Sequence, residues 1–90
     1  MVENLNVLIN KIDKLDENIV SILKKRFDVV KKVGKFKKKY NLPLCDIKRQ
    51  EEVLKIRIKQ GKHKGLNEKF IKNFYGLIFN EALNVQRRQK

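Results

Sequence analysis

The chain has 90 residues, which suits one small domain, and its 23 lysines and arginines against 10 acidic residues give a formal net charge of +13. This balance favours anionic partners but does not choose among nucleic acid, acidic lipid and small polyanionic metabolites. One cysteine, Cys45, excludes an internal disulfide, and the sequence has neither a bilayer-spanning apolar segment nor a signal-peptide core, so we expect a cytoplasmic protein.

The first predicted element is a long helix from about Leu5 to Tyr40. Its apolar residues recur at alternating intervals of three and four, a heptad spacing that forms a seam of Leu5, Leu8, Ile12, Leu15, Ile19, Ile22, Val29, Val33, Phe36 and Tyr40. Arg26 occupies the one seam position that is not apolar, and Lys37 lies on nearly the same face. A charge in a packed seam is costly unless an anion pairs with it, so both cations are candidate ligand contacts.

This first helix is too long for its own domain. About 35 residues span roughly 50 Å, whereas a compact globule of 90 residues is only about 30 Å across. We therefore expect a second chain to cover part of the seam, and a two-fold dimer is the commonest closed arrangement. The lysines on the outer flanks are expected to form a solvated face.

A short second helix is predicted after a connection that contains Pro43. The proline moves the residue before it out of helical geometry, so the first helix ends near Tyr40. Asp46 is well placed as the N-cap of a helix over Ile47–Lys59. Gly61 is predicted to stop this helix.

The third predicted helix begins after a loop over residues 62–66. Asn67 can cap it, and it should run to about Gln86 or beyond. Its face of helical period consists of Phe70, Ile71, Phe74, Leu77, Ile78 and Val85. Because strand-like alternation is absent from the sequence, we predict an all-α fold in a single domain over residues 1–90, with one long, one short and one medium helix.

Nucleophilic and metal-assisted chemistry have little to build on. His63 and Cys45 are the only histidine and cysteine, and they form no familiar metal-ligand spacing. Ser21 is the only serine and threonine is absent, which leaves no catalytic triad. The scattered glycines form no phosphate-binding loop. We therefore expect neither a metal nor a cofactor.

Fixed cations and amides are the remaining candidates. Arg49 and Gln50 lie in the first turn of the second helix, near free backbone N–H groups and the positive end of its dipole. Ala82 and Gln86 lie one turn apart on the third helix, beside its apolar face. Taken singly, these residues are more easily interpreted as ordinary helix-surface positions, and only together do they indicate a site.

The order and spacing of these residues resemble the all-helical class of chorismate mutases from about Leu8 to Gln86. The residues that carry the resemblance are Leu15, Asp16, Arg26, Val33, Gly34, Lys35, Lys37, Pro43, Asp46, Ile47, Arg49, Gly61 and Gln86. The resemblance implies an intertwined homodimer with two shared active sites, chorismate as the substrate, and no nucleic-acid or membrane partner. It also implies the rearrangement of chorismate to prephenate, in phenylalanine and tyrosine biosynthesis.

The resemblance also implies a role for each site residue. Arg26 and Arg49 would hold the two carboxylates of chorismate. Lys37 and Gln86 would donate to the ether oxygen that gains negative charge as its bond to carbon breaks. The catalytic residues are thus Arg26, Lys37 and Gln86, and the reaction needs no nucleophile and no proton transfer.

Four further positions concern the ring hydroxyl and the departures from the family pattern. Asp46, through its backbone, and Gln50 would receive the hydroxyl, with Gln50 standing where glutamate is usual. Ala82 stands where some members have a serine that contacts a carboxylate. Ile9 replaces an arginine that reaches into the other subunit's site, so we expect weak to moderate activity.

Three alternatives remain open at the level of sequence. The first is an isochorismate pyruvate-lyase, which shares this fold and much of the cation set. The second is a non-catalytic mutase-like domain in which the missing arginine marks decay. The third is a basic helical dimer that binds nucleic acid, whose affinity would fall steeply with salt.

Overall fold

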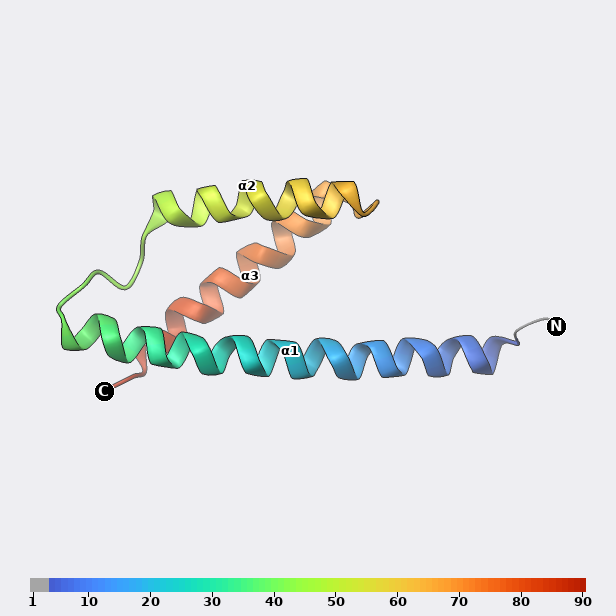
Figure 1. Cartoon of the computed structure of the whole chain (residues 1–90), viewed down its shortest axis with the longest axis horizontal. Coiled ribbons are helices and arrows are strands. Elements are labelled where there is room, and N and C mark those ends of the chain that lie inside the picture. The colour runs from blue at the N-terminus through green and yellow to red at the C-terminus, as the bar shows by residue number, and fades with distance from the viewer. Residues whose placement is uncertain (1–3) are drawn as a thin grey trace.

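The computed structural model describes residues 4–90, and within them the chain forms three helices and no strand. These are α1 (Leu5–Lys39), α2 (Ile47–His63) and α3 (Glu68–Arg87). In Figure 1, α1 is a long rod, and α3 slants from the end of α2 back to the C-terminal part of α1. The all-α prediction is confirmed. Residues 1–3, which the predicted domain includes, lie outside the described residues.

Packing between the helices centres on α3. It packs against both α1 and α2, whereas these two do not pack closely on each other within residues 4–90. Its buried row consists of Ile71, Ile78 and Val85, each 6% exposed. These residues are seven apart and so lie on one side of the helix. The predicted apolar face is therefore only partly buried, since Phe70 and Leu77 remain exposed.

A side-chain cap begins each helix. Asn4, Asp46 and Asn67 each accept a hydrogen bond from the backbone N–H three residues later, at 2.9–3.0 Å. Such a cap satisfies one of the donors that the first turn leaves free. The caps predicted at Asp46 and Asn67 are confirmed.

Helix α2 ends at His63, beyond the predicted end at Lys59. The prediction that Gly61 stops this helix is wrong. Gly61 is buried within α2, and Gly65, with φ of +81°, is the residue at which the chain turns. The Leu66 N–H donates to the Gly61 carbonyl at 2.9 Å and the Gly65 N–H to that of Lys62 at 3.0 Å, a Schellman arrangement. Asn41, with φ of +54°, ends α1 in the same way.

Gly61 is needed for packing instead. A Cβ atom at this position would lie 2.9 Å from Cγ1 of Ile71 and 3.1 Å from its Cδ1. The missing side chain therefore lets α2 approach the buried row of α3. The prediction took the first glycine after the apolar pattern as the stop, whereas the second one makes the turn.

The apolar seam of α1 is not the face that α3 covers. Its ten apolar residues remain 39–70% exposed. The less exposed residues of α1 next to them are Leu23, Phe27, Val30 and the buried Gly34, which mark a neighbouring face. Arg26 is also only partly exposed and lies at the border between the two faces.

The overall dimensions show how much of the chain is uncovered. Its extents are 60 × 26 × 14 Å, and the smallest is close to the diameter of one helix. The radius of gyration is 16.9 Å, against about 12 Å for a compact chain of this length. The accessible surface of 7799 Å² exceeds by roughly 2,300 Å² that of a folded monomer of this mass. Within residues 4–90, no helix has the length and apolar character that crossing a membrane requires.

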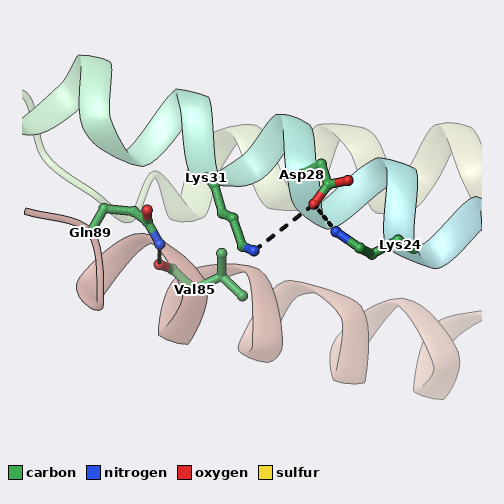
Figure 2. A network of polar contacts seen from close by, with 5 residues as sticks. All are labelled: Lys24, Asp28, Lys31, Val85 and Gln89. Atoms are coloured by element: carbon green, nitrogen blue, oxygen red, sulfur yellow. Dashed lines mark hydrogen bonds and ion pairs between the residues drawn. The ribbon is translucent and has the colours of Figure 1, made fainter.

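Figure 2 shows the polar contacts along α1 and at the end of α3. Oδ1 of Asp28 lies 2.5 Å from Nζ of Lys24 and 3.9 Å from Nζ of Lys31. The hydrogen bond from Lys24 lowers the pKa of the Asp28 carboxyl. The stability that the ionised Asp28 carboxylate contributes is therefore fully present above the pKa that Asp28 has in the unfolded chain. It is lost as the pH falls through the lower pKa that Asp28 has in the folded chain. Nε2 of Gln89 donates to the Val85 carbonyl at 2.8 Å.

We predict that Gly61→Ala lowers the free energy of unfolding by about 1–3 kcal/mol, because the new methyl group overpacks the contact with Ile71. Gly76→Ala in α3 is the matched control. A Cβ atom there meets nothing within 4 Å, so alanine should stabilise the helix by about 0.5–1 kcal/mol. Urea unfolding at one protein concentration measures both, and a Gly61→Ala protein as stable as the original would contradict the packing role.

Candidate active site

Residues from all three helices line one cavity of about 190 Å³. All seven site residues singled out from the sequence are among them: Arg26, Lys37, Asp46, Arg49, Gln50, Ala82 and Gln86. The remaining wall is mainly apolar and consists of Val30, Leu44, Val53, Phe79 and Leu83. The fold thus brings together positions in the C-terminal half of α1, near the start of α2 and near the end of α3. Ile9 is exposed in the N-terminal half of α1 and does not line this cavity.

Arg26 brings an incompletely paired charge to the cavity. Its Nη1 atom is buried and has no hydrogen-bond partner among the described residues. A buried donor without an acceptor costs about 1–3 kcal/mol, and more when the group is charged. A carboxylate on a bound molecule would remove this cost, because a guanidinium presents two parallel donors that match its geometry.

Gln86 of α3 brings an amide group to the same cavity. It is 8% exposed, and its Oε1 atom is buried without a partner in the described part of the chain. Because this oxygen makes no hydrogen bond among the described residues, it is available to a bound molecule. Gln86 can therefore offer a bound molecule either an acceptor or an N–H donor.

The connection between α1 and α2 holds Lys37. Its Nζ donates to the Leu44 carbonyl at 3.0 Å. An ammonium group has three donor hydrogens, so two remain for a ligand. The role of Leu44 was missed from the sequence, because a backbone carbonyl leaves no signal in the side-chain pattern.

The start of α2 supplies the third wall. The Asp46 carboxylate accepts from the Arg49 N–H at 3.0 Å, and the Gln50 N–H donates to the Asp46 carbonyl at the same distance. The side chain of Arg49 is exposed and lies 3.8 Å from Glu52, a surface ion pair too long and too solvated to hold it firmly. Nε2 of Gln50 donates to Sγ of Cys45 at 3.9 Å, and its amide oxygen can accept.

The balance of charge in the cavity favours an anion. Three cations, Arg26, Lys37 and Arg49, face one carboxylate, Asp46, which is engaged as a helix cap. The first turn of α2 adds the positive end of its dipole. A cavity with this charge and these donors suits a small molecule with more than one negative group.

Comparison with protein families identifies the chain. A model described as chorismate mutase type II matches residues 8–87. The chain belongs to the chorismate mutase type II family. The resemblance drawn from the sequence is therefore confirmed at the level of family.

The chain is also similar to curated members of longer architecture. It is 33% identical over 79 residues to the bifunctional chorismate mutase/prephenate dehydratase of Buchnera aphidicola subsp. Schizaphis graminum, which covers 88% of this chain and 20% of that protein. The Escherichia coli K12 protein of the same name is 31% identical over 77 residues, covering 86% and 20%. The T-protein of Enterobacter agglomerans is 29% identical over 82 residues, covering 91% and 22%. This chain spans about a fifth of each relative.

One solved structure matches nearly the whole chain. A conserved hypothetical protein from Pyrococcus furiosus is 31% identical, with a TM-score of 0.72, and the match covers 96% of this chain and 99% of that one. The three-helix arrangement is therefore shared by a protein of nearly the same extent.

We predict that Asp46→Ala lowers the free energy of unfolding by about 1 kcal/mol, because the first turn of α2 loses its cap. Asp46→Asn should retain most of the stability, since asparagine caps helices about as well as aspartate. Asn67→Ala, which removes the cap of α3, is a control of similar cost away from the cavity. Chemical unfolding measures all three, and equal losses for the Ala and Asn variants of Asp46 would contradict the capping role.

Proposed function

We propose that this chain catalyses the intramolecular rearrangement of chorismate to prephenate. The observation that carries the proposal is the cavity in which Arg26 and Gln86 present buried polar atoms that have no partner within residues 4–90. Lys37 of α1 lines the same cavity. Chorismate has two carboxylates, an ether oxygen and a ring hydroxyl. Membership of the chorismate mutase type II family supports the same reaction.

The two arginines would position the substrate. Arg26 and Arg49 each pair with one carboxylate and together hold the flexible side chain over the ring, in the conformer that reacts. For Arg49 this means leaving its weak contact with Glu52, which costs little at an exposed position. Fixing the reactive conformer removes conformational entropy before the bond-making step rather than during it.

Lys37 and Gln86 would stabilise the charge that develops. In the rearrangement a carbon–oxygen bond breaks as a carbon–carbon bond forms, and the ether oxygen becomes more negative in the transition state. The ammonium of Lys37 and the amide N–H of Gln86 donate to this oxygen while keeping their protons. A bound substrate would displace water from both groups, which would strengthen their interaction with the oxygen.

The start of α2 would receive the ring hydroxyl. Asp46 acts through its backbone and Gln50 through its amide oxygen, which accepts from the hydroxyl. Ala82 presents no polar group, so the wall that it forms makes only van der Waals contact with the substrate. Prephenate would then enter phenylalanine and tyrosine biosynthesis, which is consistent with relatives named for both chorismate mutase and prephenate dehydratase.

We further propose that the working form is a homodimer. The exposed seam of α1 and an excess of roughly 2,300 Å² of surface per chain support it, because obligate homodimers bury about 2,000–5,000 Å² in total. The N-terminal half of α1 extends past α2 and α3 and would lie on the partner subunit (Figure 1). Ile9 would then bring no charge to the partner's site, so turnover should be weak to moderate.

The activity prediction concerns Arg26. The purified chain should consume chorismate, followed by its ultraviolet absorbance, and release prephenate, identified as the product. Arg26→Ala should lower kcat/KM by about 100-fold or more, since a charge-assisted hydrogen bond is worth up to about 3 kcal/mol. Lys72→Ala, which removes a cation on the exposed side of α3, should leave the rate unchanged.

Three outcomes would contradict this assignment. Prephenate formation no faster than the uncatalysed rate would exclude the mutase activity. Full activity in Arg26→Ala would show that the site lies elsewhere. Release of pyruvate from isochorismate, without turnover of chorismate, would instead assign the pyruvate-lyase reaction.

The dimer prediction uses two neighbouring exposed residues. Ile22 belongs to the seam and Ser21 points away from it, so Ile22→Asp should convert the dimer into monomers, whereas Ser21→Asp should not. Sedimentation velocity at equal concentrations distinguishes the two masses. The proposal that the seam forms the dimer interface would be contradicted if the parent chain were a monomer. It would also be contradicted if Ile22→Asp and Ser21→Asp dissociated the dimer equally.

A further inference from the structure

Gly34 of α1 lies directly against Gln86 of α3. A Cβ atom at position 34 would be 2.9 Å from Cα of Gln86, and 3.2 Å from both its Cβ and its Cγ. A clash with Cα cannot be relieved by turning a side chain, because Cα belongs to the helix backbone. The missing side chain at position 34 therefore sets how closely α3 approaches α1 at the residue that carries the cavity amide.

Lys38 contacts the same part of α3 from one helical turn further along α1. Its Nζ donates to the carbonyl of Arg87 at 2.8 Å and also to the carbonyl of Gln89. Carbonyls at the end of a helix lack partners within the helix, so this ammonium satisfies groups that would otherwise need water. The side-chain amide of Gln89 in turn donates a hydrogen bond to the Val85 carbonyl (Figure 2). This hydrogen bond links the residues that precede and follow Gln86.

The amide group of Gln86 depends on these contacts for its location. Its Oε1 makes no hydrogen bond among the described residues, so no polar contact of this oxygen fixes its place in the cavity. The position of the amide is then set mainly by the backbone of α3 and by the packing around it. A hydrogen bond weakens steeply once its distance and angle depart from the favourable range, so a small shift of α3 would matter.

We propose that Gly34 and Lys38 are positioning residues for Gln86. Gly34 sets the separation of α3 from α1, and Lys38 fixes the last turn of α3 along and around its axis. Neither residue lines the cavity, so both act through Gln86 rather than on a bound molecule. Their effect on catalysis rests on the proposed function, whereas their effect on the location of the amide does not.

The test compares Gly34→Ala and Lys38→Met with two controls. Gly76→Ala adds a methyl group in open space, and Gly61→Ala adds one that clashes with Ile71, away from Gln86. The first readout is the pair of side-chain N–H resonances of Gln86 in ¹⁵N-labelled protein, assigned from their loss in Gln86→Ala. They should shift in both test variants and stay in place in both controls.

The second readout is the kinetics with chorismate. Gly34→Ala and Lys38→Met should lower kcat about 10-fold while KM changes less than about 3-fold, because the hydrogen bond that Gln86 donates to the ether oxygen forms mainly in the transition state. In a chain that already carries Gln86→Ala, adding either change should lower kcat less than about 2-fold, since the group through which it acts is gone.

Each result decides the proposal. Unshifted Gln86 resonances in both test variants, or a loss of kcat as large without Gln86 as with it, would overturn the positioning role. If the parent chain makes no prephenate, the proposed function fails, and the resonances alone decide whether Gly34 and Lys38 position the amide. If Gly34→Ala does not fold by circular dichroism, Lys38→Met, which removes only hydrogen bonds, decides by the same readouts.

Discussion

The packing of α3 between α1 and α2 is the constraint on which the rest of the structure depends. Among the described helices, α3 alone packs against both others, and its buried row of Ile71, Ile78 and Val85 holds it there. Glycines permit both contacts, Gly61 toward Ile71 and Gly34 toward the end of α3. Helices α1 and α2 do not pack closely on each other, so their separation at the cavity is determined by how each of them packs against α3.

This arrangement explains how a chain with so small a core carries a polar site. The buried atoms of Arg26 and Gln86 lack partners within residues 4–90, and each such atom lowers stability. A bound dianion would accept the hydrogen bond that Nη1 of Arg26 lacks, and the Gln86 amide would donate to the ligand with its N–H in place of its oxygen, so the same groups would become favourable in the complex. The proposed dimer would contribute the remaining stability by covering the seam of α1, which one chain leaves in water.

Local patterns allowed much of the fold to be predicted, and a family resemblance allowed the candidate site to be predicted. The helix caps at Asp46 and Asn67 depend on residues close in sequence, and the seven residues of the cavity followed from a family resemblance that the comparisons support. The stop at Gly61 was predicted wrongly because two glycines could end the helix, and packing against α3 decides between them. The Leu44 carbonyl and the contact at Gly34 depend on tertiary distances, which no local pattern encodes.

The most direct test of the central claim is a crystal structure with a bicyclic dicarboxylate that mimics the transition state. The account predicts that this molecule lies in the cavity, with one carboxylate about 2.7–2.9 Å from Nη1 of Arg26. Its ether oxygen should accept hydrogen bonds from Lys37 and Gln86. A dicarboxylate bound outside this cavity, or one that leaves Nη1 of Arg26 without a partner, would contradict the account.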